Sequence, residues 1–167
     1  MVFIFATDME AAPFRRLAPH ATVEICGVGM AECAAQTTKI IERHGAQQTY
    51  ILAGIAGSYS LSEVATRECV EVVSEAIEEL PAAFSRSYEN QPFTSLRRVT
   101  SNTVNRAAEA SRSQIENMEG AAFFALCKAQ GVRCAEIRAI SNRVGDPFEQ
   151  WSVAPSLERL AHELIKL

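Results

Sequence analysis

Three short segments of the 167-residue sequence carry side chains that could do chemistry, at residues 6–10, 117–120 and 138–142. Glu10 and Glu119 supply carboxylates, which can accept a proton or stabilise a positive charge that develops in a transition state. Asn142 supplies an amide, which can both donate and accept hydrogen bonds.

Each segment also has a purely structural explanation. Glu10 and Glu119 fall where the first turn of a helix is expected, and the helix dipole favours glutamate there. Ser141 and Asn142 are residue types that are common in turns. Three such clusters at strand ends favour a shared site more than any one of them alone does, but they do not name a reaction.

The periodicity of apolar residues predicts the elements that would position these segments. Strands are predicted over residues 2–7, 22–26, 49–53, 68–74, 96–100 and 132–140. Helices are predicted over residues 8–17, from after Gly29 to His44, and over 103–113, 119–130 and 151–167. A small-residue turn is predicted at 54–58 and a loop at 141–150, whereas 77–93 is irregular. This alternation predicts one α/β domain over 1–167, with its ligand at the carboxyl ends of the strands.

The composition argues against two classes of partner. Hydrophobic residues make up 48% and charged residues 22%, the net charge is -4, and no block of Lys and Arg could neutralise phosphates, so nucleic-acid binding is not expected. The apolar stretches are strand-sized, whereas a membrane-spanning helix needs about 20 apolar residues. The first residues lack a basic leader, and a cytoplasmic location is therefore expected.

Cysteine and histidine usage points to neither disulfides nor a metal. The five cysteines form an odd set without C-x-x-C spacing, which predicts buried, reduced thiols. The three histidines, at positions 20, 44 and 162, are scattered along the chain. No metal site is therefore predicted.

Two later motifs resemble the signature of the nucleoside phosphorylase/hydrolase family. They are I-E-N-M-E-G-A-A-F-F at 115–124 and I-R-A-I-S-N-R-V-G at 137–145. The forms M-E-G-A-A and R-A-I-S-N, with Trp151 downstream, are similar to futalosine hydrolases in particular, and 6–10 and 53–58 fit the first and third strand ends of the family. The resemblance covers most of the chain except 77–93. It implies a three-layer α/β fold with a central mixed sheet flanked by helices.

The resemblance also implies a role for each polar residue. Glu119 would accept hydrogen bonds from the ribose hydroxyls and stabilise the oxocarbenium character of the breaking sugar. Glu10 would orient and deprotonate the attacking water. Asn142 stands where adenosine-type nucleosidases carry an aspartic acid that can protonate N7. Its amide can instead donate to N7 or O6 of a 6-oxopurine, with Ser141 positioning that amide.

Further residues are implied to contact the substrate. Val104 falls near the position at which adenosine-type relatives carry an aromatic residue that stacks on the base. Trp151, Phe148 and Phe93 are alternative sources of stacking. The implied substrate-binding residues are Ala56, Gly57, Ser58, Val104, Asn117, Met118, Ser141 and Trp151.

The implied reaction is hydrolysis of the N-glycosidic bond of a purine nucleoside. The implied substrate is futalosine, which would release hypoxanthine in the futalosine route of menaquinone biosynthesis. A homo-oligomer without a metal or organic cofactor is expected. A phosphorylase would have to hold phosphate beneath the sugar, and the carboxylate of Glu10 would repel it, so water is the expected nucleophile.

Two alternatives stay open. One is a methylthioadenosine/S-adenosylhomocysteine-type nucleosidase, against which Asn142 argues. The other is a catalytically silent family member that binds a nucleoside or only assembles with a partner. The short, irregular segment at 77–93 favours the silent member, whereas the presence of Glu10 and Glu119 disfavours it.

Overall fold

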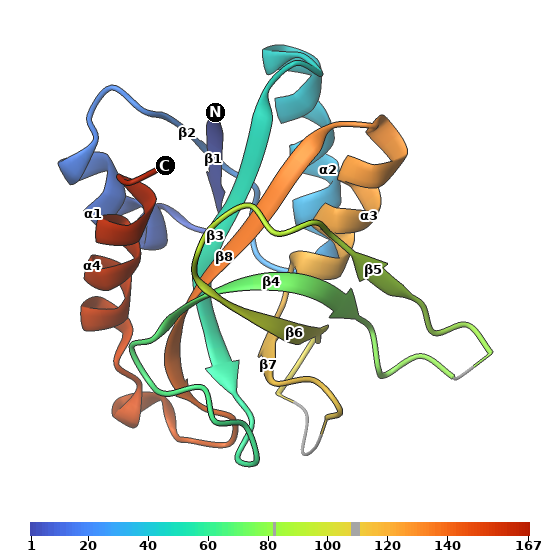
Figure 1. The fold of residues 1–167 in the computed structure, drawn as a ribbon, viewed down its shortest axis with the longest axis vertical. Helices are drawn as coiled ribbons and strands as arrows, with labels where there is room; N and C mark the ends of the chain where they lie inside the picture. The colour runs from blue at the N-terminus through green and yellow to red at the C-terminus, as the bar shows by residue number, and fades with distance from the viewer. Residues whose placement is uncertain (82, 108–110) are drawn as a thin grey trace.

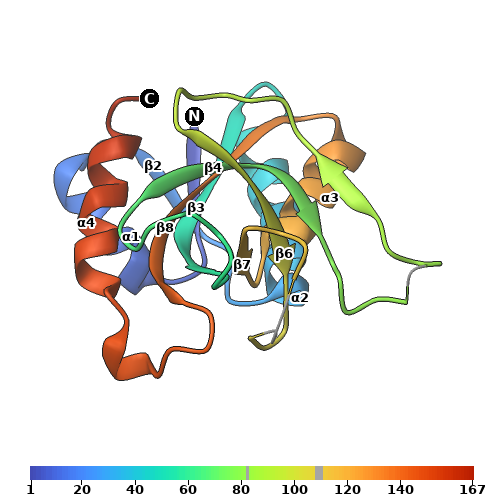
Figure 2. The same cartoon turned by 60° about the horizontal axis from the view of Figure 1, so that its bottom comes forward.

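The chain folds into three layers, a strand layer between two pairs of helices (Figure 1). The structure is a computed structural model that describes residues 1–81, 83–107 and 111–167. One face of the strands carries α1 (Asp8–Leu17) and α4 (Val153–Leu164). The other carries α2 (Met30–His44) and α3 (Gly120–Gln130). Figure 2 shows the two pairs on opposite sides, which confirms the predicted α/β architecture.

The central layer is a mixed sheet. Its first half is parallel: β1 (Val2–Phe5) pairs with β2 (Thr22–Ile25) and β3 (Thr49–Ser58), and β3 pairs with β8 (Arg133–Arg143). The second half holds β4 (Cys69–Ala76), β5 (Ser87–Glu89), β6 (Arg97–Thr103) and β7 (Ile115–Asn117). There the pairs of β4 with β5 and with β8, and of β3 with β7, are antiparallel.

Five of these strands close into a ring. β3 pairs with β8, β8 with β4, β4 with β6, β6 with β7, and β7 pairs back with the end of β3. Closing a sheet on itself leaves no strand edge within the ring. The ring therefore holds the ends of β3, β6, β7 and β8 next to one another, although they lie far apart in the sequence.

Two apolar cores flank the strands. Along β3, successive side chains point to opposite faces, as strand geometry requires. Leu52 joins the core beneath α2 and α3, together with Phe123. Ile51 joins the core beneath α1 and α4, together with Phe14. Because its side chains alternate, β3 contributes to both apolar cores and thus packs beneath both pairs of helices.

Several predicted boundaries are wrong, and the small residues at 54–58 account for one of them. β3 continues through residues 54–58, which were expected to turn, and β8 continues to Arg143, where a loop was expected from residue 141. A helix was predicted over 103–113, but β6 continues to Thr103 and no helix covers the described residues that follow. Residues 108–110 lie outside the described chain. β5, which lies within the irregular segment, and β7 have three residues each, too few for a periodic pattern.

Within the described residues, no helix combines the length and the apolar character needed to cross a membrane.

The core beneath α1 and α4 gives a stability prediction. The ring of Phe14 is 1% exposed, and its centroid lies 4.6 Å from that of Phe3 and 6.0 Å from that of Phe5. Phe14→Ala should lower the free energy of unfolding by about 3–5 kcal/mol, because it leaves a cavity in a packed core. Chemical denaturation measures this loss. Phe84→Ala is the control, since Phe84 is 70% exposed; equal losses in both variants would contradict the packing described.

Candidate active site

A cavity of about 500 Å³ opens where the ring of strands meets the start of α1. Every catalytic and substrate-binding residue that the resemblance implies lines it except Ser58. Those residues are Glu10, Ala56, Gly57, Val104, Asn117, Met118, Glu119, Ser141, Asn142 and Trp151. The remaining lining residues are Ala6, Thr7, Met9, Val28, Ile55, Arg106, Ala107, Glu116, Gly145 and Asp146. The structure thus brings residues of the three polar clusters together around one cavity.

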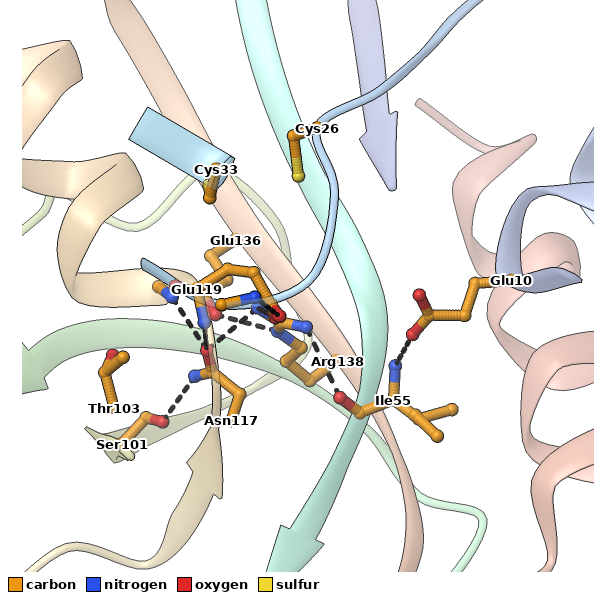
Figure 3. A network of polar contacts seen from close by, with 12 residues as sticks. Glu10, Cys26, Cys33, Ile55, Ser101, Thr103, Asn117, Glu119, Glu136 and Arg138 are labelled. Carbon is orange, nitrogen blue, oxygen red and sulfur yellow. Dashed lines mark hydrogen bonds and ion pairs between the residues drawn. The ribbon is translucent and has the colours of Figure 1, made fainter. Parts of the chain in front are cut away.

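Glu10 is held in the first turn of α1. Thr7 caps the helix: its hydroxyl accepts a hydrogen bond from the backbone N–H of Glu10 at 3.2 Å and donates to Glu10 Oε2 at 3.1 Å. The backbone N–H of Ile55, in β3, donates to Glu10 Oε1 at 3.1 Å (Figure 3). Burial raises the pKa of Glu10 above its ordinary value, and the Ile55 N–H and the charge of Arg138 oppose that rise.

Glu119 precedes α3 and is fixed from two sides. The backbone N–H of Gly29, in the loop before α2, donates to Glu119 Oε1 at 3.0 Å. Gly29 has a φ of +87°, a conformation that favours glycine. Arg138 Nη2 donates to Glu119 Oε2 at 3.3 Å. Both carboxylate oxygens therefore have one protein donor, and a carboxylate can accept further bonds from a ligand.

Arg138 is the residue whose importance the sequence did not reveal. Its side chain is 1% exposed, and its guanidinium donates to Glu136 Oε1, Asn117 Oδ1 and Ile55 O at 2.8, 3.0 and 3.3 Å, besides Glu119 (Figure 3). Burial alone would lower the pKa of Arg138, but the carboxylates of Glu136 and Glu119 raise it, so the charge persists. The charges of Glu136 and Arg138, two residues apart in the otherwise apolar stretch 134–140, were a usable signal, because they share one face of the strand.

Gly54 lets two of these charged groups meet. A Cβ atom at this position would lie 2.8 Å from Glu10 Oε1 and 2.9 Å from Arg138 Nη1. No side chain can therefore replace the glycine without displacing the site. The small residues that predicted a turn in fact belong to a strand over which Glu10 and Arg138 converge.

The amide of Asn142 is oriented by its neighbours. The Ser141 hydroxyl donates to Asn142 Oδ1 at 2.7 Å, and Asn142 Nδ2 donates to the backbone oxygen of Arg143 at 2.9 Å. One N–H of this amide is left for a ligand in the cavity. Ser58 lies behind the lining, where its hydroxyl donates to the backbone oxygen of Asn142 at 3.4 Å and accepts from Arg143.

Val104 lines the cavity, and of the three possible stacking residues Trp151 lines it, whereas Phe148 and Phe93 do not. Trp151 Nε1 donates to the backbone oxygen of Asp146 at 3.0 Å, and its ring contacts Phe148, with the centroids 5.3 Å apart. Phe93 instead packs against the core beneath α1 and α4. Trp151 is thus the aromatic side chain available to a ligand among the described lining residues. In the same described ranges, no group of three or more His, Cys, Asp and Glu side chains is arranged to hold a metal ion.

Comparison with known proteins agrees with the architecture. The family model of the phosphorylase superfamily matches residues 63–167. The futalosine hydrolase of Thermus thermophilus is 45% identical over 56 residues, a segment that covers 33% of this chain and only 25% of that relative.

Solved structures extend the likeness in fold over nearly the whole chain. The 5′-methylthioadenosine/S-adenosylhomocysteine nucleosidase of Helicobacter pylori superposes with a TM-score of 0.84 at 14% identity, covering 98% of this chain and 95% of that one. The futalosine hydrolase of Helicobacter pylori superposes with a TM-score of 0.83 at 14% identity, covering 98% and 94%. With its α/β fold and the match over residues 63–167, the chain belongs to the phosphorylase superfamily.

Proposed function

We propose that this protein hydrolyses the N-glycosidic bond of a 6-oxopurine nucleoside, with futalosine as the preferred substrate. The observation that carries the proposal is the convergence of Glu10, Glu119 and Asn142 on one cavity. The local identity to a futalosine hydrolase supports the choice of substrate.

In the proposed reaction, Glu119 binds the ribose and Glu10 activates water. Glu119 accepts hydrogen bonds from the ribose hydroxyls, and its charge stabilises the sugar as it becomes cationic. A water oxygen forms a bond to the anomeric carbon while its proton passes to Glu10. The carbon–nitrogen bond breaks, its electron pair leaves with the purine, and the purine anion takes up a proton from solvent while Glu10 returns its proton to solvent. The free N–H of Asn142 stabilises the departing 6-oxopurine by donating to it.

The charge of the cavity supports hydrolysis over phosphorolysis. Among the described lining residues, four side chains are acidic and one is basic, namely Glu10, Glu116, Glu119, Asp146 and Arg106. The buried Arg138 is already paired with Glu119 and Glu136. Phosphate would meet net negative charge there, whereas water would not be repelled.

A methylthioadenosine-type nucleosidase is the second candidate. Its support is structural: a variant of the Helicobacter pylori nucleosidase, which holds 5′-methylthioadenosine in its active site, superposes with a TM-score of 0.79 at 16% identity. Asn142 disfavours this candidate, because an amide cannot protonate N7 of a departing adenine.

Product analysis in phosphate buffer tests the proposal. The purified protein should release hypoxanthine and the free sugar from futalosine, with inosine and methylthioadenosine as poorer substrates. No sugar 1-phosphate should form, because the lining repels phosphate. Chromatography with mass detection measures each product. Detection of a sugar 1-phosphate would overturn the hydrolase assignment, and release of base from none of the three nucleosides would favour a catalytically silent binding protein.

The pH dependence tests the role of Glu10. A general base must be ionised, and burial raises the pKa of Glu10 above the ordinary 4.5, so kcat/KM should fall as the pH drops through that raised value. The acidic limb of the profile should therefore lie above pH 4.5. Glu10→Gln should lower kcat about 100-fold or more. Glu63→Gln is the control, since the Glu63 side chain is 92% exposed. A limb at or below pH 4.5, or a fully active Glu10→Gln, would refute this role.

Asn142→Asp tests base recognition. The new carboxyl can protonate N7 and accept from an exocyclic amine, so the change should favour adenine over hypoxanthine nucleosides. One polar contact in a buried pocket is worth about one to two decades in relative rate. The readout is the ratio of kcat/KM for two nucleosides that share one sugar. Asn105→Asp, at an exposed residue outside the cavity lining, is the control, and an unchanged ratio in Asn142→Asp would remove Asn142 from base recognition.

A further inference from the structure

Two fully buried carboxyl groups, those of Glu75 and Glu136, lie beneath the candidate active site, and the sequence analysis connected neither residue with it. Glu75, on β4, accepts hydrogen bonds from Asn117 Nδ2 at 2.5 Å and from the Thr103 hydroxyl at 2.7 Å. Glu136, on β8, accepts at Oε1 from Arg138 Nε at 2.8 Å. Glu136 Oε2 is buried and has no donor among the described residues. An unsatisfied buried carboxylate oxygen is costly, and it calls for an explanation.

The two carboxyl groups adjoin each other at the start of α3. A Cβ atom on Gly120 would lie 2.6 Å from Glu136 Oε2 and would also overlap the carboxyl of Glu75. The missing side chain of Gly120 is therefore what gives both groups room. The oxygen of Glu136 that lacks a donor is the one that shares this space with Glu75.

The surrounding charges decide how many protons the two groups hold. Arg138 is the cation that faces both, and it also pairs with Glu119, while Glu10 lies on its far side. Burial and the charge of Glu136 raise the pKa of Glu75, and the hydrogen bonds from Thr103 and Asn117 and the charge of Arg138, to which Glu75 is not hydrogen-bonded, only oppose that rise. Burial also raises the pKa of Glu136, but its ion pair with Arg138 opposes that rise. Two carboxylates in such contact do not both ionise, and the group without the cation keeps the proton.

We propose that Glu75 and Glu136 share one proton, carried by Glu75 and donated to Glu136 Oε2, and that this pair positions Arg138 and Asn117 around Glu119. The donated hydrogen bond satisfies the orphaned oxygen. It also leaves Glu136 with a negative charge, which pairs with the guanidinium of Arg138.

Asn117 transmits this arrangement to the cavity. Its Nδ2 donates to Glu75 and to Ser101, so its Oδ1 must face the other way. There Oδ1 accepts from the backbone N–H groups of Glu119 and Gly120 and from Arg138, at 2.9, 2.7 and 3.0 Å. Glu75 is thus a positioning residue: it touches no substrate, but it fixes the amide that orients Glu119.

Infrared difference spectroscopy at neutral pH tests the shared proton directly. Subtracting the spectrum of Glu75→Gln from that of the wild type should reveal the C=O stretch of a protonated carboxyl, shifted in deuterium oxide. Glu71→Gln is a matched control, because Glu71 is equally buried on β4 but accepts from the N–H groups of Phe93 and Thr94 and from the Thr94 hydroxyl. The protonated-carboxyl band should persist in the spectrum of Glu71→Gln. The proposal falls if the wild type has no protonated-carboxyl band, or if the band survives in Glu75→Gln.

The positioning role is tested by comparing two substitutions at one residue. Glu75→Gln keeps a neutral donor to Glu136 Oε2 and gives up only the bond from Asn117, whose Nδ2 still has Ser101 as an acceptor. Glu75→Ala also leaves Glu136 Oε2 without a donor and the Thr103 hydroxyl without its acceptor. Glu75→Ala should lower Tm by about 5–10 °C and Glu75→Gln by less than half of that. Equal losses in the two variants would overturn the role. If Glu75→Ala does not fold, a fall in Tm of more than about 5 °C in Glu75→Gln would overturn it instead.

The kinetic comparison rests on the proposed function. In a nucleosidase assay, Glu75→Ala should lose about 10-fold or more in kcat with a smaller change in KM, and Glu75→Gln should recover most of that loss. A loss confined to KM would contradict the proposal that Glu75 positions Glu119. If the wild type cleaves no nucleoside, the proposed function fails, whereas the infrared and Tm comparisons still decide whether Glu75 and Glu136 share a proton.

Discussion

The structure depends on one buried cation. A guanidinium out of contact with water is tolerated only when carboxylates and hydrogen-bond acceptors surround it, and removing a partner from such a group is strongly destabilising. Arg138 obtains those partners from β3, β7, β8 and the start of α3. Each partner is therefore held in place, because no water can replace it beside the buried guanidinium. The rigidity of the candidate site is a consequence of this electrostatic requirement.

The closed ring of strands makes that arrangement possible. It brings the end of β7 between β3 and β6, so that Asn117 and Glu119 reach Arg138 from a part of the chain about 20 residues away. Glycine supplies the remaining space, since Gly54 and Gly120 stand where any side chain would strike a carboxyl group. Backbone closure and missing Cβ atoms together allow the ionisable groups to pack densely in the interior.

The sequence predicts the outer layers well and the inner ring poorly. The bounds of α1 match the prediction, because a capping threonine and an amphipathic face are local signals. Glu10, Glu119 and Asn142 could be placed at one site, because their motifs follow or end parallel strands. The contact between Glu75 and Glu136 could not be predicted, since it depends on the antiparallel pairing of β4 with β8. No local pattern specifies a pairing between strands so far apart in the sequence.

The short strand β5 bears on how this fold can change over evolutionary time. It lies at one end of the strand order and pairs with β4 through three residues of each strand. Among the described residues, none of the cavity lining comes from the segment 77–93 that contains β5. The described hydrogen bonds from this segment to the rest of the chain come from near its two ends, as from Glu78 to Asn102 and from Phe93 to the buried Glu71. A change of length in the middle of the segment should therefore be tolerated more readily than one in a ring strand, where an added residue would shift the partners of Arg138.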